Sequence, residues 1–470
     1  FGDTRLKEKD NAVFVTGQIG FRRFLNFDFT LRNDWLSTLP PATNDILSKS
    51  FGGSFIFSDL LKIPFLSSGK IRASWGETPQ SLGNGRRTSG IFTYPGAQYF
   101  AGSSNLWNGN FLQGVNSGSV DPAISGAVAK QAEVGIDLAF LKNRLGFSVS
   151  YYKYVSKDFP QSVPVYLPTG TSSYTTNSGE INKEGIDVQF NARPLAMKNL
   201  SWDISATWAY LLSNKIVDID GDPSTNNGRQ VVENIWGSGT PYLVHLDGQQ
   251  WGTMFGNGKK RDAAGNPLLD GNGNFVTDAN VNYGNVLPKY TGGVQNTFTV
   301  FGNFTINANI DYQMGGKFFS LSDMWGSYTG VLARTAGVND KGNPMRDPVA
   351  QGGGTHVFGV DQTTLKPVDY YVNTRLYYEN LYGNKIFDDY VYDLTFVKLR
   401  EVSLGYNIPV AKLGIGKWIT RANFSIIARQ PLLIYAKNKD FDPSEISNLS
   451  GEAGGFPGTR SLGVNLKLGF

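Results

Sequence analysis

The last ten residues of the chain, SLGVNLKLGF (residues 461–470), alternate strictly between apolar side chains and polar or small ones. Successive side chains of a β-strand point to opposite faces, so this segment is expected to form a strand with one apolar and one polar face. A tilted strand of about ten residues is long enough to cross a bilayer. We therefore predict a membrane-inserting strand whose lipid-facing row is Leu462, Val464, Leu466, Leu468 and Phe470.

The same period of two recurs along the chain, which predicts roughly thirteen strands in all. The alternation is clearest in residues 303–314, where six apolar and six polar side chains take turns. In residues 392–408 the phase slips between Leu399 and Val402, which predicts a β-bulge near Arg400. The twelve further segments are 11–21, 24–34, 51–58, 70–76, 131–140, 144–156, 183–193, 201–213, 291–300, 303–314, 392–408 and 421–430.

The connections between these segments alternate between short and long. Arg22-Arg23, Leu141-Lys142-Asn143 and Phe301-Gly302 are short turns. Outer-membrane barrels pair short periplasmic turns with long extracellular loops. The pattern therefore predicts an antiparallel transmembrane β-barrel in the bacterial outer membrane, with its last strand running toward the periplasm. The long loops are expected at about 35–50, 77–130, 157–182, 214–290, 315–391 and 431–460.

A soluble β-sandwich or propeller is the alternative fold. Its strands are usually about five or six residues long, whereas most of the segments here run to ten or more. The composition also favours a barrel, because 13% of the 470 residues are aromatic and 56 are glycine. Membrane barrels concentrate aromatic residues in two interfacial girdles. No run of 18 apolar residues predicts a transmembrane helix, and the lack of a starting Met or signal peptide leads us to expect part of a longer polypeptide.

The composition and motifs exclude several functional classes. The absence of Cys excludes disulfides and thiolate metal sites, and a net charge of +4 is too small to indicate nucleic-acid binding. We find neither a Walker loop nor a G-x-S-x-G elbow, and both histidines, His245 and His356, fall in long loops. We therefore predict no enzymatic activity and no cofactor.

One segment resembles a calcium-binding loop. Asp270, Asn272 and Asn274 have the spacing with which such a loop begins, but position twelve is Val281 instead of Glu. A Gly/Asn-rich turn is the alternative interpretation, and we favour it.

Aromatic residues in the long loops are candidates for contact with a solute or a partner. They lie among Gly, Ser and Asn, a combination that suits sugar rings or peptide side chains. The alternative is that they pack the loops against one another. The candidates are Phe92, Tyr94, Tyr99, Phe100, Trp107, Phe111, Phe319, Trp325 and Tyr328.

Several segments together match the motifs of one known family. The matching segments are Arg32-Asn33-Asp34-Trp35-Leu36-Ser37-Thr38, Lys70-Ile71-Arg72-Ala73-Ser74-Trp75-Gly76, Asn177-Ser178-Gly179 with Asn182-Lys183-Glu184-Gly185-Ile186-Asp187, Gly284-Asn285 with Pro288 and Gly292-Gly293, residues 396–406, and Asp442-Pro443-Ser444. In this order and spacing they resemble the SusC/RagA-type TonB-linked outer-membrane proteins of the Bacteroidetes. Two departures are Leu36, where the family has Ser, and Gln430-Pro431-Leu432, where it commonly has Asn-Leu.

The resemblance implies a transporter with a 22-stranded barrel closed by an amino-terminal plug. This chain would supply the carboxy-terminal strands, about thirteen of them, without the plug. The resemblance further implies import of oligosaccharides or peptides with energy from TonB, and a SusD-like lipoprotein over the extracellular mouth. The lipid bilayer would be a further partner. Two other functions remain open at this stage: a passive porin-like channel, and a structural or docking barrel in a larger outer-membrane complex.

Overall fold

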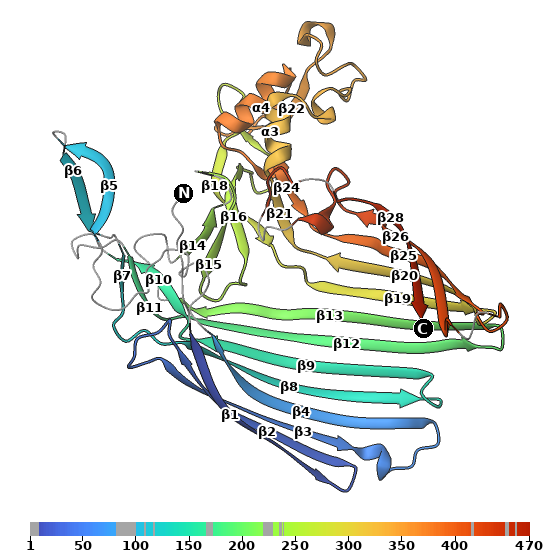
Figure 1. Cartoon of the computed structure of the whole chain (residues 1–470). Helices are drawn as coiled ribbons and strands as arrows, with labels where there is room; N and C mark the ends of the chain where they lie inside the picture. The colour runs from blue at the N-terminus through green and yellow to red at the C-terminus, as the bar shows by residue number, and fades with distance from the viewer. Residues whose placement is uncertain are drawn as a thin grey trace. The chain divides into compact units, whose positions relative to one another are not determined.

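Long β-strands and the loops between them make up the chain (Figure 1). The computed structural model describes residues 9–80, 100–107, 110–115, 118–165, 173–219, 229–234, 237, 239–414, 418–446, 451–455 and 458–470. The chain divides into two compact units. Unit 1 comprises Phe1–Gln230, Leu246–Trp251 and Val294–Gly302, and unit 2 comprises Val231–His245, Gly252–Gly293 and Asn303–Phe470.

Within the described residues, thirteen strands pair in chain order in one antiparallel sheet. All thirteen predicted segments are strands of this sheet, so the predicted all-β fold is confirmed. The strands that begin in unit 1 are β1 (Asp10–Phe21), β2 (Leu25–Leu36), β3 (Asp45–Ile56), β4 (Leu66–Gln80), β8 (Ala127–Phe140), β9 (Leu145–Lys157), β12 (Glu180–Ala196) and β13 (Leu200–Asp218). The others are β19 (Tyr290–Val300), β20 (Phe304–Met314), β25 (Phe396–Ile408), β26 (Arg421–Ala436) and β28 (Ser461–Gly469).

The register of unit 1 aligns apolar side chains across neighbouring strands. Ile71 of β4 is opposite Ile136 of β8, and Ile136 is opposite Val149 of β9. Val149 is in turn opposite Val188 of β12, which is opposite Trp208 of β13. Because the side-chain period of a strand is two, residues an even number of positions from this row, such as Ala73, Val134 and Phe147, share its face where no bulge intervenes.

The register of unit 2 produces a second apolar row. Ile306 of β20 is opposite Leu404 of β25, Leu404 is opposite Ile426 of β26, and Ile426 is opposite Val464 of β28. All four side chains are exposed, with Val464 at 73%. A contiguous exposed apolar face of this kind suits the hydrocarbon core of a bilayer, because in water it would favour association.

The bulge predicted near Arg400 is confirmed. On one side of β25, Asn309 pairs with Glu401 while Ile310 pairs with Leu399, so Arg400 has no partner residue. On the other side of β25, Leu399 pairs with Leu432 and Glu401 pairs with Arg429, so Arg400 is again skipped. The extra residue explains why the apolar period shifts between Leu399 and Val402.

The predicted alternation of short and long connections is present, with one correction. Residues 22–24, 141–144, 197–199 and 301–303 are short turns, and Arg22 and Phe301 adopt positive φ angles of 48° and 51°. The bounds predicted for the first long loop, about 35–50, are wrong. Strand β2 continues to Leu36 and β3 begins at Asp45, so the connection comprises only residues 37–44.

The error at the first loop has a physical cause. Ile46 packs with Leu36, Leu39 and Ile124 in a hydrophobic cluster, whereas Leu47 is 61% exposed. Ile46 is therefore buried on the face that is polar elsewhere in the sheet, opposite Asp34 of β2, whereas Leu47 is on the apolar face. A pattern that assumes one apolar face misses a segment in which the buried face changes.

The long connections contain secondary structure of their own. Residues 315–395, which we call the head module, contain α3 (Leu321–Thr329) and α4 (Thr374–Gly383). A buried cluster that includes Phe319, Phe387 and Tyr390 forms one core of this module. No helix within the described part of the chain is long and apolar enough to cross a membrane. The loop strands are β5 (Phe100–Trp107), β6 (Asn110–Val115), β7 (Gly118–Val120), β10 (Pro160–Pro164), β11 (Ser173–Asn177), β14 (Arg229–Asn234), β15 (Tyr242–Leu246), β16 (Thr253–Lys259), β17 (Leu268–Leu269), β18 (Thr277–Asn285), β21 (Lys317–Ser320), β22 (Thr355–Asp361), β23 (Pro367–Val372), β24 (Val391–Asp393) and β27 (Gly451–Glu452).

Candidate functional site

The polar face of unit 1 contains a network of paired charges. Asp137 of β8 accepts from Lys70 Nζ at 2.9 Å and from Ser148 Oγ at 2.6 Å. Arg72 of β4 pairs with Glu133 and lies 3.6 Å from Asp137. Each residue is on the face opposite the apolar row because it is an odd number of positions from a residue of that row. The network presents hydrogen-bonding groups of both signs, which suits a wall along which a polar solute passes.

A glycine allows Arg72 to lie flat on the sheet. Gly135 is directly opposite Arg72 in the β4–β8 register. A Cβ atom at Gly135 would lie 2.9 Å from Cζ of Arg72, which is closer than such contacts allow. The missing side chain therefore makes room for the guanidinium group beside its two carboxylates.

An open hollow of about 590 Å³ lies on the same face of unit 1, beside the short turns. Its lining includes Lys142, Arg144, Arg193 and Asp203. Arg193 donates to Asp203 at 2.6 Å, so these two charged groups form a pair. The other two charged groups of the hollow, Lys142 and Arg144, are cations. The hollow is thus a positively charged part of the polar face.

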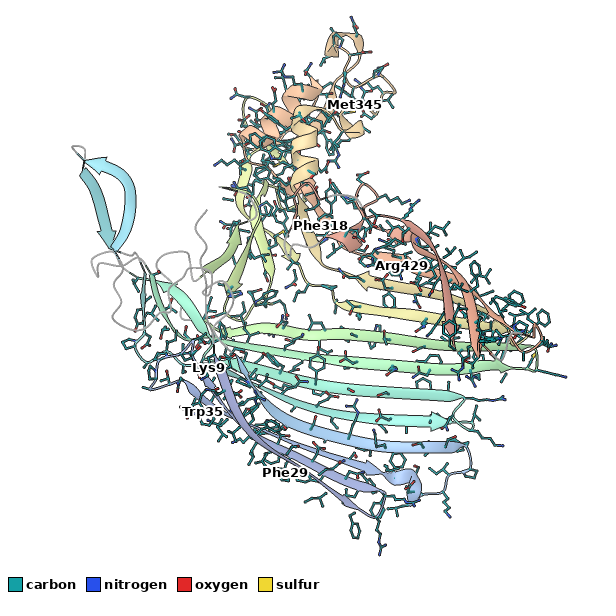
Figure 2. The ribbon with its side chains drawn as sticks, viewed as in Figure 1. Lys9, Phe29, Trp35, Phe318, Met345 and Arg429 are labelled. Atoms are coloured by element: carbon teal, nitrogen blue, oxygen red, sulfur yellow. The ribbon has the colours of Figure 1, made fainter. Side chains whose placement is uncertain are left out.

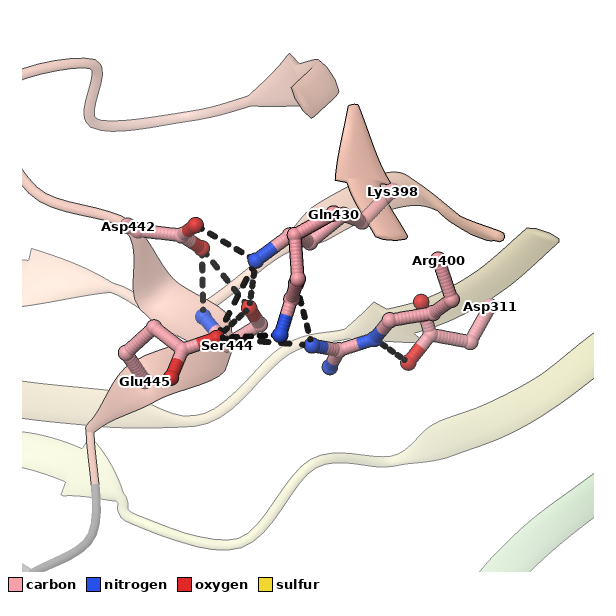
Figure 3. Close-up of polar contacts among 7 residues, drawn as sticks. All are labelled: Asp311, Lys398, Arg400, Gln430, Asp442, Ser444 and Glu445. Carbon is pink, nitrogen blue, oxygen red and sulfur yellow. Dashed lines mark hydrogen bonds and ion pairs between the residues drawn. The ribbon is translucent and has the colours of Figure 1, made fainter. Parts of the chain in front are cut away.

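The buried Lys398 of β25 joins the last long loop to the sheet of unit 2 (Figure 3). Its side chain is 2% exposed, and its ammonium donates to Asp442 at 2.6 Å, Ser444 at 2.8 Å and Glu445 at 3.1 Å. These three acceptors belong to the turn around η6 (Pro443–Glu445). Burial alone would raise the pKa of the Asp442 carboxyl, but the hydrogen bonds from Lys398 and Ser444 outweigh it and lower that pKa.

The bulged Arg400 extends the same cluster (Figure 3). Its Nε donates to Asp311 Oδ2 at 2.7 Å, and its Nη1 donates to Gln430 Oε1 at 3.1 Å and lies 3.5 Å from Glu445. A bulge re-aims a side chain, and here Arg400 bridges β20, β26 and the η6 turn. The second oxygen of Asp311 is buried without a hydrogen bond in the described structure.

A buried carboxylate organises the head module. Asp323 of α3 is 3% exposed; it pairs with Arg334 at 3.2 Å and accepts from the Tyr392 hydroxyl. Burial raises the pKa of Asp323 against the hydrogen bond from Tyr392 and the charge of Arg334. Glu452 of β27 accepts from Ser320 and Ser322 at 2.7 Å each, which attaches the last long loop to the start of α3.

The structure also explains the Asn177-Ser178-Gly179 segment. The Asn177 side chain accepts from the Ser125 backbone N–H at 2.7 Å and donates to the Ser125 and Asp158 carbonyls at 2.9 and 2.8 Å. Gly179 has a φ of +91°, and a Cβ there would lie 2.6 Å from the Phe159 ring. One asparagine thus holds together two loops of unit 1.

The structure describes the side chains of only three of the predicted loop aromatics. Phe319 is fully buried, so the packing alternative applies to it. Trp325 and Tyr328 are half-buried on α3, and their rings contact Tyr382 at 5.1 and 4.8 Å. Phe92, Tyr94 and Tyr99 lie outside the described residues, as do the side chains of Phe100, Trp107 and Phe111 in β5 and β6. Their role stays a prediction.

The residues of the predicted calcium loop form a turn. Asp270 Oδ1 accepts from the backbone N–H groups of Asn272 and Asn274 at 2.9 and 2.8 Å. The side-chain oxygen of Asn274 accepts from Asn380 at 3.0 Å. These are the hydrogen bonds of an Asx turn, and the calcium site stays a prediction. Among the described residues, no three His, Cys, Asp or Glu side chains are grouped to hold a metal ion.

The predicted membrane-inserting row lies on β28 and is exposed along its whole length. Exposure falls from 77% at Leu462 to 40% at Leu468 and is 87% at Phe470.

Sequence reasoning missed Lys398 and Asp442 as a pair, although it identified both segments as resembling a family. The available clue was a lysine two positions after Phe396, which places both on the same face of one strand.

Comparison with known proteins identifies the same family. The family model described as "TonB dependent receptor-like, beta-barrel" matches residues 1–322. TonB-dependent receptor P3 of Formosa agariphila is 26% identical over an alignment of 374 residues that covers 72% of this chain and 34% of that protein. TonB-dependent receptor SusC of Bacteroides thetaiotaomicron is 22% identical, and the alignment covers 72% of this chain and 31% of the SusC chain. The chain thus spans about a third of the length of these relatives.

A solved structure, the RagAB peptide transporter, has the same fold. It superposes with a TM-score of 0.71 at 18% identity and covers 98% of this chain and 47% of that chain. The matched proteins are receptors and transporters and not enzymes, and they confirm the predicted SusC/RagA resemblance and the location in the outer membrane. This chain belongs to the TonB-dependent receptor-like β-barrel family.

Proposed function

We propose that the protein containing this chain imports oligosaccharides or peptides across the outer membrane with energy delivered through TonB. One observation carries the proposal: the strand registers separate an apolar face from a face with paired charges. The row from Ile71 to Trp208 is on the first face, and Arg72, Glu133 and Asp137 are on the second. A polar face behind a lipid-facing one supplies a path for polar solutes, and family membership supplies the link to TonB.

We further propose a SusD-like surface lipoprotein as the partner of the long loops. The head module carries large apolar side chains that are exposed, among them Val331 at 77%, Leu365 at 64% and Phe358 at 61%. Exposed apolar groups on a folded loop are typical of interaction surfaces. A solved structure of the same fold is that of the RagAB peptide transporter.

Uptake measurements in the native organism test the import function. Cells that lack the gene should lose growth on one class of oligosaccharide or peptide, and the intact gene should restore it. Removal of TonB should abolish that growth as well, because the energy for import is delivered through TonB. Growth that continues without TonB would contradict import and favour a passive channel.

Purification tests the partner. The full-length protein, extracted in mild detergent, should carry a surface lipoprotein with it. Replacing Val331, Phe358 and Leu365 by Ser should weaken this association. Leu61→Ser is the matched control, because Leu61 is equally exposed, at 58%, but lies in a short connection. Repeated recovery of the folded barrel without any lipoprotein would contradict the partnership and favour a docking role with other proteins.

A further inference from the structure

Helices α3 and α4 of the head module lie side by side (Figure 1). They border an open hollow of about 620 Å³. Ligand sites of proteins commonly have volumes of about 300–1,000 Å³. The hollow belongs to unit 2 alone, and no sequence motif pointed to it. The side chains that could contact a ligand there are Tyr328, Arg346, Asn373, Arg375, Tyr378 and Glu379.

Two guanidinium groups on the hollow have unused donors. Arg375 donates through Nε to Glu379 at 2.7 Å, is 80% exposed, and has no other acceptor among the described residues. Arg346 donates through Nε and Nη2 to the 330–335 turn, including Thr335 at 3.1 and 3.0 Å, and its Nη1 has no acceptor there. An arginine carries five N–H donors, so both groups can bind a further oxygen anion.

A hydroxyl in the lining is also available as a donor. Tyr378 of α4 is 9% exposed as a residue and lines the hollow, and its hydroxyl makes no hydrogen bond within the described part of the chain. Burial raises the pKa of this hydroxyl, so it stays protonated as a donor. A ligand oxygen in the hollow could accept a hydrogen bond from it.

The rest of the lining favours an anionic ligand with an apolar part. The hollow contains two cations and one anion, Glu379. It also adjoins the start of α4, where Asn373 caps the helix and no acidic residue occupies the first turn. The N-terminal end of a helix carries a partial positive charge. Tyr328 adds an aromatic surface that is held by Trp325 and Tyr382.

We propose that this hollow binds a carboxylate-bearing ligand, with Arg375 and Arg346 contacting the carboxylate and the Tyr378 hydroxyl donating to a ligand oxygen. The carboxylate can come from the end of a short peptide or from an acidic sugar. The identification of this ligand as the imported solute rests on the proposed function. The proposal that the hollow binds a carboxylate does not rest on it.

Titration calorimetry with the full-length protein in detergent tests the binding. The probes are acetyl-triglycine and its carboxamide, and trigalacturonic acid and its methyl ester. Each carboxylate form that binds should bind at least tenfold more tightly than its neutral counterpart, because only the anion accepts two N–H bonds from one arginine. The pair that shows this difference identifies the source of the carboxylate. Equal binding of both members of each pair, or no binding by any probe, would overturn the proposal.

Substitutions locate the binding within the hollow. Arg375→Gln should weaken carboxylate binding about tenfold or more, and Tyr378→Phe should weaken it less while keeping the ring. Lys366→Gln is the control, because it removes a cation from an exposed position of the same module outside the hollow. Arg375 is exposed, so its loss should leave the fold intact, as the heat-modifiable gel mobility of the barrel will show. Unchanged affinity in the Arg375→Gln protein contradicts the assignment.

The two proposals can fail separately. If carboxylate probes bind and Arg375→Gln abolishes this, but uptake does not need TonB, the binding site stands and the import function fails. If uptake needs TonB but the Arg375→Gln protein binds every probe as the unaltered protein does, the import function stands and the binding site fails.

Discussion

Lys398 and Asp442 are 44 residues apart in the chain, and their side chains meet at 2.6 Å where the last long loop contacts the sheet. Lys398 is the more buried of the two, with 2% of its side chain exposed against 24% for Asp442. A buried ammonium requires compensating charge. The Asp442-Pro443-Ser444 turn supplies that charge, and the loop is thereby fixed over strand β25.

We expect Lys398→Met to release the η6 turn from the sheet. Removing one partner of a buried ion pair costs roughly 3–5 kcal/mol, and the partial exposure of Asp442 places this pair near the lower end. Amide hydrogen exchange of residues 442–446 should accelerate while that of β28 stays slow. Lys412→Met is the control, because Lys412 is an exposed residue of the turn after β25. Unchanged exchange at 442–446 would show that the pair does not hold the loop.

The loop structure around β15 and β16 should lose stability as the pH falls below neutrality. Burial lowers the pKa of His245 from 6.5 to about 4. Because the folded form resists protonation, this stability is fully present above about pH 6.5 and decreases as the pH falls toward 4. The protection of Tyr242–Leu246 against hydrogen exchange, taken relative to the intrinsic exchange rate at each pH, should therefore decrease as the pH falls over that range.

Substitution of each histidine assigns this pH dependence. The chain has two histidines, so His245→Gln should remove the effect between pH 6.5 and 4, and His356→Gln should leave it in place. A pH dependence that survives in the His245→Gln protein would assign it to another group.

A charge on the apolar face of β28 should impair membrane assembly. Leu466 is opposite Phe424 on this face, and a lysine at the bilayer midplane costs about 2–4 kcal/mol. Leu466→Lys should lower the amount of heat-modifiable barrel in outer membranes. Asn465→Lys places the same charge one residue away on the polar face and should be tolerated. Equal losses in both variants would show that the two faces are not distinguished.

Asn177→Ala should loosen two loops of unit 1 together. The substitution removes four hydrogen bonds, which contribute about 0.5–1.5 kcal/mol each, and leaves the Ser125 backbone groups without their partner. Limited proteolysis should cut near residues 121–126 and 158–159 sooner than in the unaltered protein. Asn199→Ala, at an exposed asparagine of a short turn, should not change the cleavage rate.

Sequence periodicity located the sheet well because each strand obeys a local rule. All thirteen strands, the bulge at Arg400 and the alternation of short and long connections follow from side chains that point to opposite faces at every step. The rule failed at residues 45–50, because Ile46 is buried by contacts with Leu36 and Ile124, which are distant in the chain.

The amino-acid sequence by itself determined which residues share the apolar face of each strand, since that choice depends only on alternation along one strand. Tertiary structure alone decided which charges meet. Lys398 pairs with Asp442, and Arg72 pairs with Glu133. Arg346, Arg375 and Tyr378 line the same hollow. In each case, strand register and loop folding bring together segments that are far apart in the chain. Such pairings depend on distance and burial in three dimensions, and no local period of the sequence encodes them.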